Sequence, residues 1–264
     1  MAYKYLLVLF YINTAPADIN SKIYLITNLT LLSEEEILVD ISIVVPTYNE
    51  RENIENLLHD VSKTLEGYDY EIIIVDDNSP DGTAGIVQEY AADVDRIRLL
   101  VRSGKLGLGS AILDGFRMAK GNYFLMIDAD LSHRPEDIKL LIDNRKGADI
   151  VIGSRYIKGG KIIGWPMKRR IISWSAVGLA KNLFNLKVKD PVSGFALYKK
   201  EIFERQSSKL DPIGYKLLLE ILVKSQELTV TEIPITFMER KNGQSKLNID
   251  EIINFIKLCW RLRI

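Results

Sequence analysis

Apolar residues along the chain form short continuous runs that alternate with segments in which they recur at helical spacing. Residues 41–45 and 71–75 are β-branched runs ended by Pro46 and Asp76, which predicts strands buried on both faces. Residues 50–65 lie between them and place their apolar side chains on one helical stripe. The members of that stripe are Ile54, Leu57, Leu58, Val61 and Leu65. A strand, a helix and a strand in this order predict a βαβ unit with parallel strands.

The same alternation continues as far as Tyr156. The next predicted strands are residues 97–101, 123–127 and 149–152, and the predicted helices between them are residues 110–120 and 135–142. Beyond Tyr156 we predict a Gly- and Lys-rich segment, two helices and a strand-like segment, which are residues 158–164, 168–184, 215–223 and 228–237. The predicted fold class is therefore α/β, with a mostly parallel sheet flanked by helices.

The pattern divides the chain into three parts. Residues 1–38 contain no motif, and we expect residues 1–40 to be an N-terminal extension with little order. Its longest apolar run, residues 5–12, is far shorter than the ~20 residues that cross a bilayer. Residues 41–248 form the predicted main domain. Residues 249–264 read as an amphipathic helix with Lys and Arg side chains. This helix either packs on the sheet or docks on a membrane surface, where Phe255 and Trp260 would insert.

Composition and charge narrow the classes of function. The 264 residues include 35 Lys plus Arg and 35 Asp plus Glu, so the formal net charge is zero, which argues against a general nucleic-acid binder. A hydrophobic fraction of 47% is typical of a globular protein with a substantial core. The single cysteine, Cys259, excludes an internal disulfide and a cysteine metal cluster, so a cytosolic active site fits best.

Carboxylates follow three of the predicted strands. Glu50 comes after the first strand, Asp76 and Asp77 end the second, and Asp128 and Asp130 follow the fourth. Ligands of a parallel sheet bind beyond the carboxyl ends of its strands, so these side chains share one rim. A lone Asp after a strand commonly caps a helix, but two carboxylates spaced by one residue favour a site for Mg²⁺ or Mn²⁺. Such a cation completes its shell with phosphates and water, which implies a bound nucleoside diphosphate.

Several ordered segments extend this interpretation. Residues 46–50 (Pro-Thr-Tyr-Asn-Glu), residues 75–83 and residues 128–133 (Asp-Ala-Asp-Leu-Ser-His) resemble the signatures of inverting family 2 glycosyltransferases with the GT-A fold. Further segments resemble the dolichyl-phosphate mannosyltransferases of that family, and these are residues 153–156, 190–195, 214–216 with Glu220, and 240–246. The resemblance covers residues 41–247 and implies that residues 41–248 are the catalytic domain of a nucleotide-diphospho-sugar transferase.

The resemblance implies roles for residues at the rim. It implies donor binding by Pro46, Tyr48, Glu50, Val75, Asp76, Asp77, Asp128, Ala129, Asp130, Arg155, Arg240 and Lys246. It also implies metal ligation by Asp128, Asp130 and Ser132. Some relatives carry Gln at the third of these positions, and a hydroxyl is a weaker ligand that a water could replace. His133 is open between a metal ligand, a base and a side chain that hydrogen-bonds a loop.

Basic residues in the second half of the chain supply the other part of the predicted site. The resemblance implies that Arg169 and Ser173 bind an acceptor phosphate, and whether Arg169 or Arg170 faces the site is open. It assigns catalytic roles to Asp130, Arg155, Arg240 and Lys246. A phosphate acceptor has its second pKa at about 6 and is ionised at neutral pH. The site therefore needs cations rather than a general base.

A glycine-rich loop at residues 104–109 follows the third predicted strand with the spacing G-x-x-G-x-G. A dinucleotide-binding fingerprint needs G-x-G-x-x-G after the first strand. A nicotinamide oxidoreductase is therefore disfavoured, and we expect a tight turn that lets the backbone approach the donor.

By the resemblance, the expected function is transfer of mannose from GDP-mannose to dolichyl or another polyprenyl phosphate, with inversion to a β-linked product. Three alternatives stay open, which are UDP-glucose as donor, a hydroxyl acceptor, and a noncatalytic nucleotide-sugar-binding subunit. The expected partners are GDP-mannose, the polyprenyl phosphate, a membrane surface and a membrane-protein partner, with no nucleic acid. The expected location is the cytoplasm, peripheral on the cytoplasmic face of a membrane.

Overall fold

The computed structural model describes residues 39–263 except residues 212–215, 226 and 241–248. Almost all of the predicted N-terminal extension, residues 1–38, lies outside the described residues. Lys246, which the resemblance places in the site, also lies outside them. The described residues belong to one compact unit that begins at Val39.

Within the described residues, seven strands form one sheet in the order β3-β2-β1-β4-β7-β5-β8. Their bounds are β1 Ile41–Thr47, β2 Tyr70–Asp76, β3 Ile97–Val101, β4 Tyr123–Met126, β5 Ile150–Ser154, β7 Ala196–Lys199 and β8 Val230–Pro234. Neighbouring strands are parallel except for β7, which runs antiparallel to β4 and to β5. A separate pair of parallel strands consists of β6 (Lys161–Ile163) and β9 (Thr236–Met238). The predicted mostly parallel sheet is confirmed.

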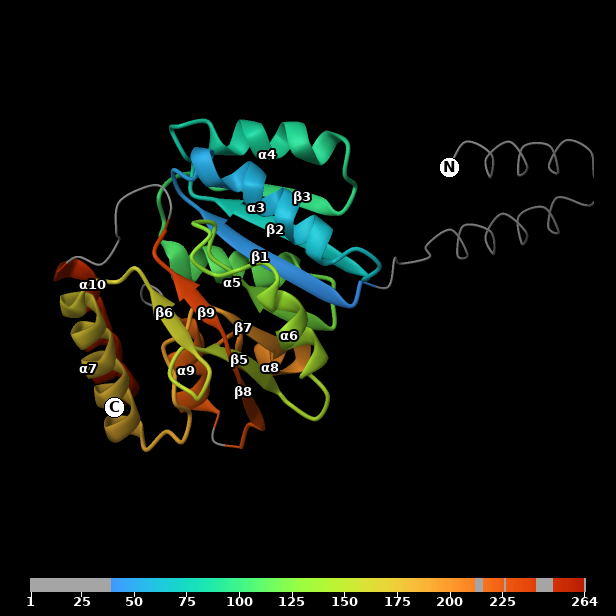
Figure 1. Ribbon diagram of the computed structural model, residues 1–264. Coiled ribbons are helices and arrows are strands. Elements are labelled where there is room, and N and C mark those ends of the chain that lie inside the picture. The colour runs from blue at the N-terminus through green and yellow to red at the C-terminus, as the bar shows by residue number, and fades with distance from the viewer. Residues whose placement is uncertain (1–38, 212–215, 226, 241–248, 264) are drawn as a thin grey trace, which may run out of the picture. The chain divides into compact units, whose positions relative to one another are not determined.

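Helices cover both faces of this sheet (Figure 1). One face is covered by α3 (Arg51–Thr64), α4 (Thr83–Ala92) and α6 (Asp137–Asp143). The other face is covered by α5 (Leu108–Met118), α8 (Lys200–Gln206) and α9 (Leu217–Lys224). Strands β1 and β2 are buried along their whole length because both faces are covered. The predicted α3 stripe lies fully inside the core.

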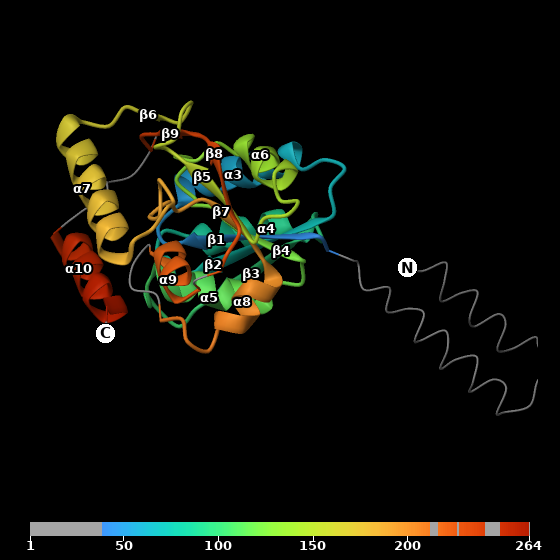
Figure 2. The same cartoon turned by 90° about the horizontal axis from the view of Figure 1, so that it is seen from below.

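Two further helices, α7 (Met167–Phe184) and α10 (Ile249–Arg263), lie side by side beyond one end of the sheet (Figures 1 and 2). They share a small apolar cluster that includes Val177, Ala180, Phe255 and Leu258. Trp260 is 70% exposed on α10, whereas Phe255 is buried. The expectation that Phe255 inserts into a membrane is therefore wrong, because this side chain packs on the domain. None of the helices in the described ranges is long and apolar enough to cross a bilayer.

Four elements were absent from the sequence predictions. They are α4, β6, β7 and α8. Helix α4 buries only Thr83 and Val87, so its sequence lacks a clear apolar stripe. Strands β6 and β7 are three and four residues long, which is too short for a periodic pattern. The predicted strand-like segment at residues 228–237 is two strands, β8 and β9, interrupted at Ile235.

Candidate active site

A pocket of about 430 Å³ opens where the chain leaves β4, and its lining comes from segments far apart in the sequence. Its ionisable lining residues are Asp128, Asp130, His133, Arg155, Arg169, Lys216, Arg240 and Glu251. Its apolar lining comes mainly from the two outer helices, with Ile171, Ile172, Ala176 and Leu179 on α7 and Ile252, Phe255 and Ile256 on α10. The pocket therefore joins a charged site to an apolar wall.

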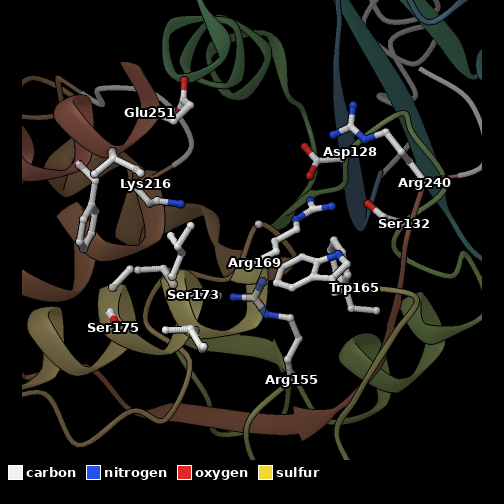
Figure 3. A pocket seen from close by; sticks show the side chains of 18 of the residues that line it. Asp128, Ser132, Arg155, Trp165, Arg169, Ser173, Ser175, Lys216, Arg240 and Glu251 are labelled. Atoms are coloured by element: carbon white, nitrogen blue, oxygen red, sulfur yellow. The ribbon is translucent and has the colours of Figure 1, made fainter. Parts of the chain in front are cut away.

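Asp128 and Asp130, the carboxylate pair after β4, both line this pocket, and Figure 3 shows Asp128 on the same side as Ser132 and Arg240. Asp130 accepts hydrogen bonds from the backbone N–H of Ser132 at 3.0 Å and from its hydroxyl. The Nη2 atom of Arg240 lies 2.9 Å from Oδ2 of Asp130. Leu131, between these residues, has a φ of 58°, which is costly for a bulky residue. Backbone strain of this kind is often found at functional sites.

The ionisation state of Asp130 suits a cation site. Burial raises the pKa of this carboxyl, but the hydrogen bond from Ser132 and the charge of Arg240 outweigh burial, so the pKa lies below its usual value. Asp128, Asp130 and Ser132 offer two carboxylates and a hydroxyl, and oxygen donors are the ligands that Mg²⁺ and Mn²⁺ prefer. The donor set therefore fits the metal that the sequence predicts.

His133 is part of the pocket lining but is poorly suited to act as a base. Its ring stacks on Phe195 at 5.0 Å and meets Phe237 edge-on at 4.9 Å between centroids. Burial lowers the pKa of His133 to about 4, in spite of the opposing charge of Asp130. Its Nδ1 lies 3.9 Å from a carboxylate oxygen of Asp128. At neutral pH the imidazole is therefore neutral and is held among aromatic rings.

Arg155 follows β5 and is held by the buried Asp190. Nε and Nη2 of Arg155 each lie 2.8 Å from a different carboxylate oxygen of Asp190. Burial lowers the pKa of the guanidinium, but the Asp190 charge and its hydrogen bonds raise it above its usual value. Asp190 belongs to a segment that the resemblance used without giving this residue a role.

Arg169 stacks on an aromatic side chain that the sequence analysis did not select. Its guanidinium carbon lies 4.1 Å from the ring centroid of Trp165, which lines the same pocket. Arg170 instead donates to the backbone oxygens of Trp165 and Ile162, at 3.3 and 2.9 Å. Ser173 lines the pocket beside Arg169. Of the two candidate arginines, Arg169 is thus the one that lines the pocket.

Lys216 and Glu251 reach the same pocket from the opposite wall, and Figure 3 shows Lys216 directed toward Arg169 and Arg155. Burial, and then the charge of Arg155, lower the pKa of Lys216 to about 8. Lys216 belongs to a quoted motif but had no predicted role, and Trp165 and Glu251 were not predicted. The available signals were the Trp165-Pro166 pair just before a helix rich in basic residues, and Glu251 on the amphipathic helix.

Ala129, between the two carboxylates after β4, is buried and does not line the pocket. The remaining predicted donor residues that the structure describes lie at the ends of β1 and β2, also outside the lining of the pocket. They are Pro46, Tyr48, Glu50, Val75, Asp76 and Asp77. Asp76 accepts hydrogen bonds from the hydroxyls of Thr47 and Ser79 at 2.7 and 2.6 Å, and from the N–H of Ser79 at 2.8 Å. We call residues 46–50 and 76–83 the donor rim. These hydrogen bonds tie its two segments together.

The predicted turn at residues 104–109 is confirmed at Gly107, whose φ is 101°. The N–H of Gly107 donates to Asp77 at 2.8 Å, and Arg102 pairs with the same carboxylate at 2.7 Å. The ammonium group of Lys105 lies 4.2 Å from the ring centroid of Tyr48. The loop is thus bound to the donor rim through contacts at Asp77 and Tyr48.

Comparison with known proteins identifies a family and several relatives of this chain. Residues 42–206 match the model of glycosyl transferase family 2. The chain is 44% identical over 225 residues to a dolichol-phosphate mannosyltransferase of Pyrococcus furiosus, covering 84% of this chain and 63% of that relative. It is 37% identical over 214 residues to a polyprenol monophosphomannose synthase of Mycolicibacterium smegmatis, covering 78% of this chain and 80% of that relative.

A solved structure supports the fold. Glucosyl-3-phosphoglycerate synthase from Mycobacterium tuberculosis, in complex with Mn²⁺, UDP and glucosyl-3-phosphoglycerate, matches with a TM-score of 0.60 at 20% identity, over 85% of this chain and 78% of that chain. This likeness concerns the fold alone, and it confirms the predicted GT-A type of α/β architecture. With the family model matched over most of the chain, the protein belongs to glycosyl transferase family 2.

Proposed function

We propose that the chain transfers mannose from GDP-mannose to a polyprenyl phosphate such as dolichyl phosphate, with inversion to a β-linked product. The observation that carries this proposal is a pocket in which a carboxylate pair, several cations and an apolar wall meet. Carboxylates suit a metal-bound nucleoside diphosphate, cations suit a phosphate, and an apolar wall suits a polyprenyl tail. The names of the two relatives support mannose as the sugar and a polyprenyl phosphate as the acceptor.

In this reaction an oxygen of the acceptor phosphate forms a bond to the anomeric carbon of mannose. The bond from that carbon to the diphosphate breaks, and its electron pair leaves with GDP. The acceptor phosphate is already ionised at neutral pH because its second pKa is about 6. No proton has to be removed, which is consistent with the neutral, buried state of His133.

The chief task of the protein is then to hold two anions in line. Among the described residues, the cations that line the pocket are Arg155, Arg169, Lys216 and Arg240. We assign Arg169, Ser173 and Lys216 to the acceptor phosphate, and Arg240 and Lys246 to the donor diphosphate, with Arg155 between the two anions. Fixed cations in a partly dehydrated site stabilise charge more strongly than water does.

A divalent cation, Mg²⁺ or Mn²⁺, belongs to the same proposal. Asp128, Asp130 and Ser132 would hold it, because they bring oxygen donors to one side of the pocket. When bound, such a cation neutralises charge on a leaving diphosphate. Arg240 already pairs with Asp130 at 2.9 Å. We infer that Arg240 and the metal share the negative charge of this carboxylate.

We also propose that the protein works at the cytoplasmic face of a membrane as a peripheral protein, alone or with a membrane-protein partner. Helices α7 and α10 both expose large apolar side chains, among them Ile171, Trp174, Ile256 and Trp260. Exposed Trp and Ile side chains on paired helices suit the membrane interface. Arg261 is a weak candidate for lipid binding, because it pairs with Asp211 and with Glu220.

The decisive experiment measures turnover with a panel of substrates. GDP-mannose and UDP-glucose are each combined with a polyprenyl phosphate and with the matching polyprenol, in the presence of Mg²⁺ or Mn²⁺. We expect rapid transfer from GDP-mannose to the phosphate and little transfer to the alcohol. A preference for UDP-glucose would overturn the donor assignment. Transfer to the alcohol at a comparable rate would overturn the acceptor assignment.

A further inference from the structure

Asp190 lies in the loop between α7 and β7, and its side chain is completely buried. It accepts hydrogen bonds from the backbone N–H of Arg155 at 3.0 Å and from Nε and Nη2 of the same residue at 2.8 Å each. Asp190 does not line the pocket, whereas Arg155 does. The Asp190 carboxylate therefore contacts Arg155 from outside the pocket that Arg155 lines.

The pairing determines which edge of the Arg155 guanidinium is left available to a ligand. Asp190 binds the edge of the guanidinium formed by Nε and Nη2. A guanidinium carries five N–H donors, and its other edge, formed by Nη1 and Nη2, is a second fork of the kind that binds phosphate with two parallel hydrogen bonds. An arginine held by one edge therefore offers the other edge in a fixed direction.

Aromatic rings limit the remaining movement of this guanidinium. Its central carbon lies 5.2 Å from the ring centroid of Tyr156, 5.6 Å from that of Phe237 and 5.9 Å from that of Trp165. Rings at this distance attract a cation through their negative faces. Arg155 is thus held at its side by a carboxylate and bordered by three rings.

Asp190 is itself held in place by two neighbouring strands. Glu232 on β8 accepts hydrogen bonds from the N–H groups of Lys189 and Asp190, at 2.8 and 3.0 Å. The hydroxyl of Ser193 donates to the backbone oxygen of Gly153 on β5 at 2.7 Å. The loop is therefore fastened on both sides of Asp190, and the direction of the carboxylate is set by the sheet.

A gain in stability is a weak explanation for this arrangement. Burying an ion pair costs desolvation free energy that the attraction between the charges often fails to recover. Both partners are nearly inaccessible, with side-chain exposure of 8% for Arg155 and 0% for Asp190. What the pair provides is a cation whose orientation is fixed before the substrate binds, which lowers the cost of binding an anion.

We propose that Asp190 is a positioning residue that directs the Nη1–Nη2 edge of Arg155 at the phosphate of the acceptor. The proposal rests on the proposed function for the identity of that phosphate. Asp190 touches no substrate itself, and it acts only through Arg155. Glu232 acts one step further back by holding the loop that carries Asp190.

The test measures binding of geranyl phosphate, a short soluble acceptor analogue, by calorimetry. It compares the wild type with Asp190→Asn, Arg155→Gln and the double variant. Asp190→Asn removes the charge with little change of shape, and we expect the dissociation constant to rise roughly 10- to 100-fold. In the Arg155→Gln background the same change should have almost no further effect, because the two residues act as one unit. Glu232→Gln should weaken binding in the same direction by a smaller factor.

Glu71→Gln provides a matched control. Glu71 is also a buried carboxylate that pairs with an arginine, Arg98, at 2.8 Å, but it lies at the opposite end of β2 from the donor rim. The Glu71→Gln substitution should lower the free energy of unfolding and leave the affinity for geranyl phosphate unchanged. If Asp190→Asn behaves in the same way, Asp190 is only structural and the proposal fails. Independent, multiplicative effects of Asp190→Asn and Arg155→Gln would overturn it as well.

The outcome also separates this proposal from the proposed function. A wild-type protein that binds geranyl phosphate and shows the expected coupling, yet transfers no mannose, would support the role of Asp190 and overturn the mannosyltransferase assignment. A wild-type protein that binds no geranyl phosphate would overturn both.

Discussion

The donor rim, which lies outside the lining of the pocket, and the cations that line the pocket use charge in different ways. At the donor rim, Asp76 and Asp77 are buried, and their carboxylate oxygens accept hydrogen bonds from neighbouring residues. Arg155, Arg169 and Lys216 line the pocket, and we call these three residues the cationic wall. The rim uses its charges to hold two segments of the protein together, and the wall presents its charges to the pocket.

This contrast separates stability from activity. A buried group that is already bonded within the protein contributes to the fold, and its loss leaves partners without a counter-charge. A cation that lines a pocket near other cations is repelled by them until an anion binds. The charge of Arg240 is one cause of the lowered pKa of Arg169, after burial. Loss of the Asp77 charge should therefore mainly change stability, and variants of Arg169 and Lys216 should mainly change substrate binding.

The largest effect is expected at Asp130, which faces both the predicted metal and Arg240. Asp130→Asn removes the charge but retains an oxygen acceptor for Ser132. We expect turnover to fall by about 10³-fold or more, a size typical for the loss of a group that stabilises developing charge. A titration of Mg²⁺ and Mn²⁺ against activity checks this. Near-normal activity at every metal concentration would contradict the assignment.

The next largest effect is a loss of stability when a buried charge of the donor rim is removed. Asp77→Asn removes the closer of the two carboxylates that pair with Arg102, at 2.7 Å against 3.3 Å for Asp114, and the side chains of Asp77 and Arg102 are almost inaccessible, at 6% and 5% exposure. We expect the free energy of unfolding in urea to fall by about 3 kcal/mol. Arg169→Met on the cationic wall should leave this quantity almost unchanged while weakening acceptor binding. An equal fall in the free energy of unfolding for Asp77→Asn and Arg169→Met would contradict the distinction between the donor rim and the cationic wall.

A smaller effect should be seen in the pH dependence of acceptor binding by the cationic wall. Lys216 has a pKa of about 8 because burial and Arg155 disfavour its charge. Lys216 is therefore protonated below about pH 8, and the KM for the acceptor should rise several-fold as the pH increases through this value. Lys216→Arg should remove this step because arginine stays charged. A step of equal size in that variant would show that another group titrates.

The lowered pKa of Lys216 also predicts how the stability of the fold depends on pH, and this effect is opposite in sign to the effect on acceptor binding. The ordinary pKa of lysine is 10.5, so between pH 8 and 10.5 the unfolded chain holds a proton that the folded chain releases. The contribution of Lys216 to the free energy of unfolding therefore rises with pH in this window. Lys216→Met should abolish that rise, which equilibrium unfolding at several pH values can measure.

The smallest effect concerns the two faces of α10. Trp260→Ala should lower partition onto anionic vesicles by roughly threefold to tenfold, because Trp favours the membrane interface. Phe255→Ala is the matched variant on the buried face, and it should lower the free energy of unfolding instead. Equal vesicle binding by wild type and Trp260→Ala would leave the docking role of this face without support.

The sequence was most informative where one segment carries a complete pattern. The strands at residues 41–45 and 71–75 and the Asp128–Asp130 pair could be placed because burial and spacing are local properties. Lys216 and Trp165 could be placed in one pocket only from the folded chain, because α9, β9 and the outer helices bring them together. Asp190 was hardest to interpret, because its proposed role depends on a hydrogen bond to Arg155, which is 35 residues away in the sequence and follows β5.

Strand β7 has a consequence for the order in which the protein assembles during synthesis. It pairs with β4 on one side and β5 on the other, yet β5, β6 and α7 all precede it along the chain. At about 5–20 residues per second, a ribosome leaves the far edge of β4 unpaired for several seconds before β7 emerges. An open strand edge can recruit other chains, so the nascent protein should be most prone to aggregate in this interval. Lys216 of the cationic wall follows β7 along the chain, so the wall can be completed only after β7 has been synthesised.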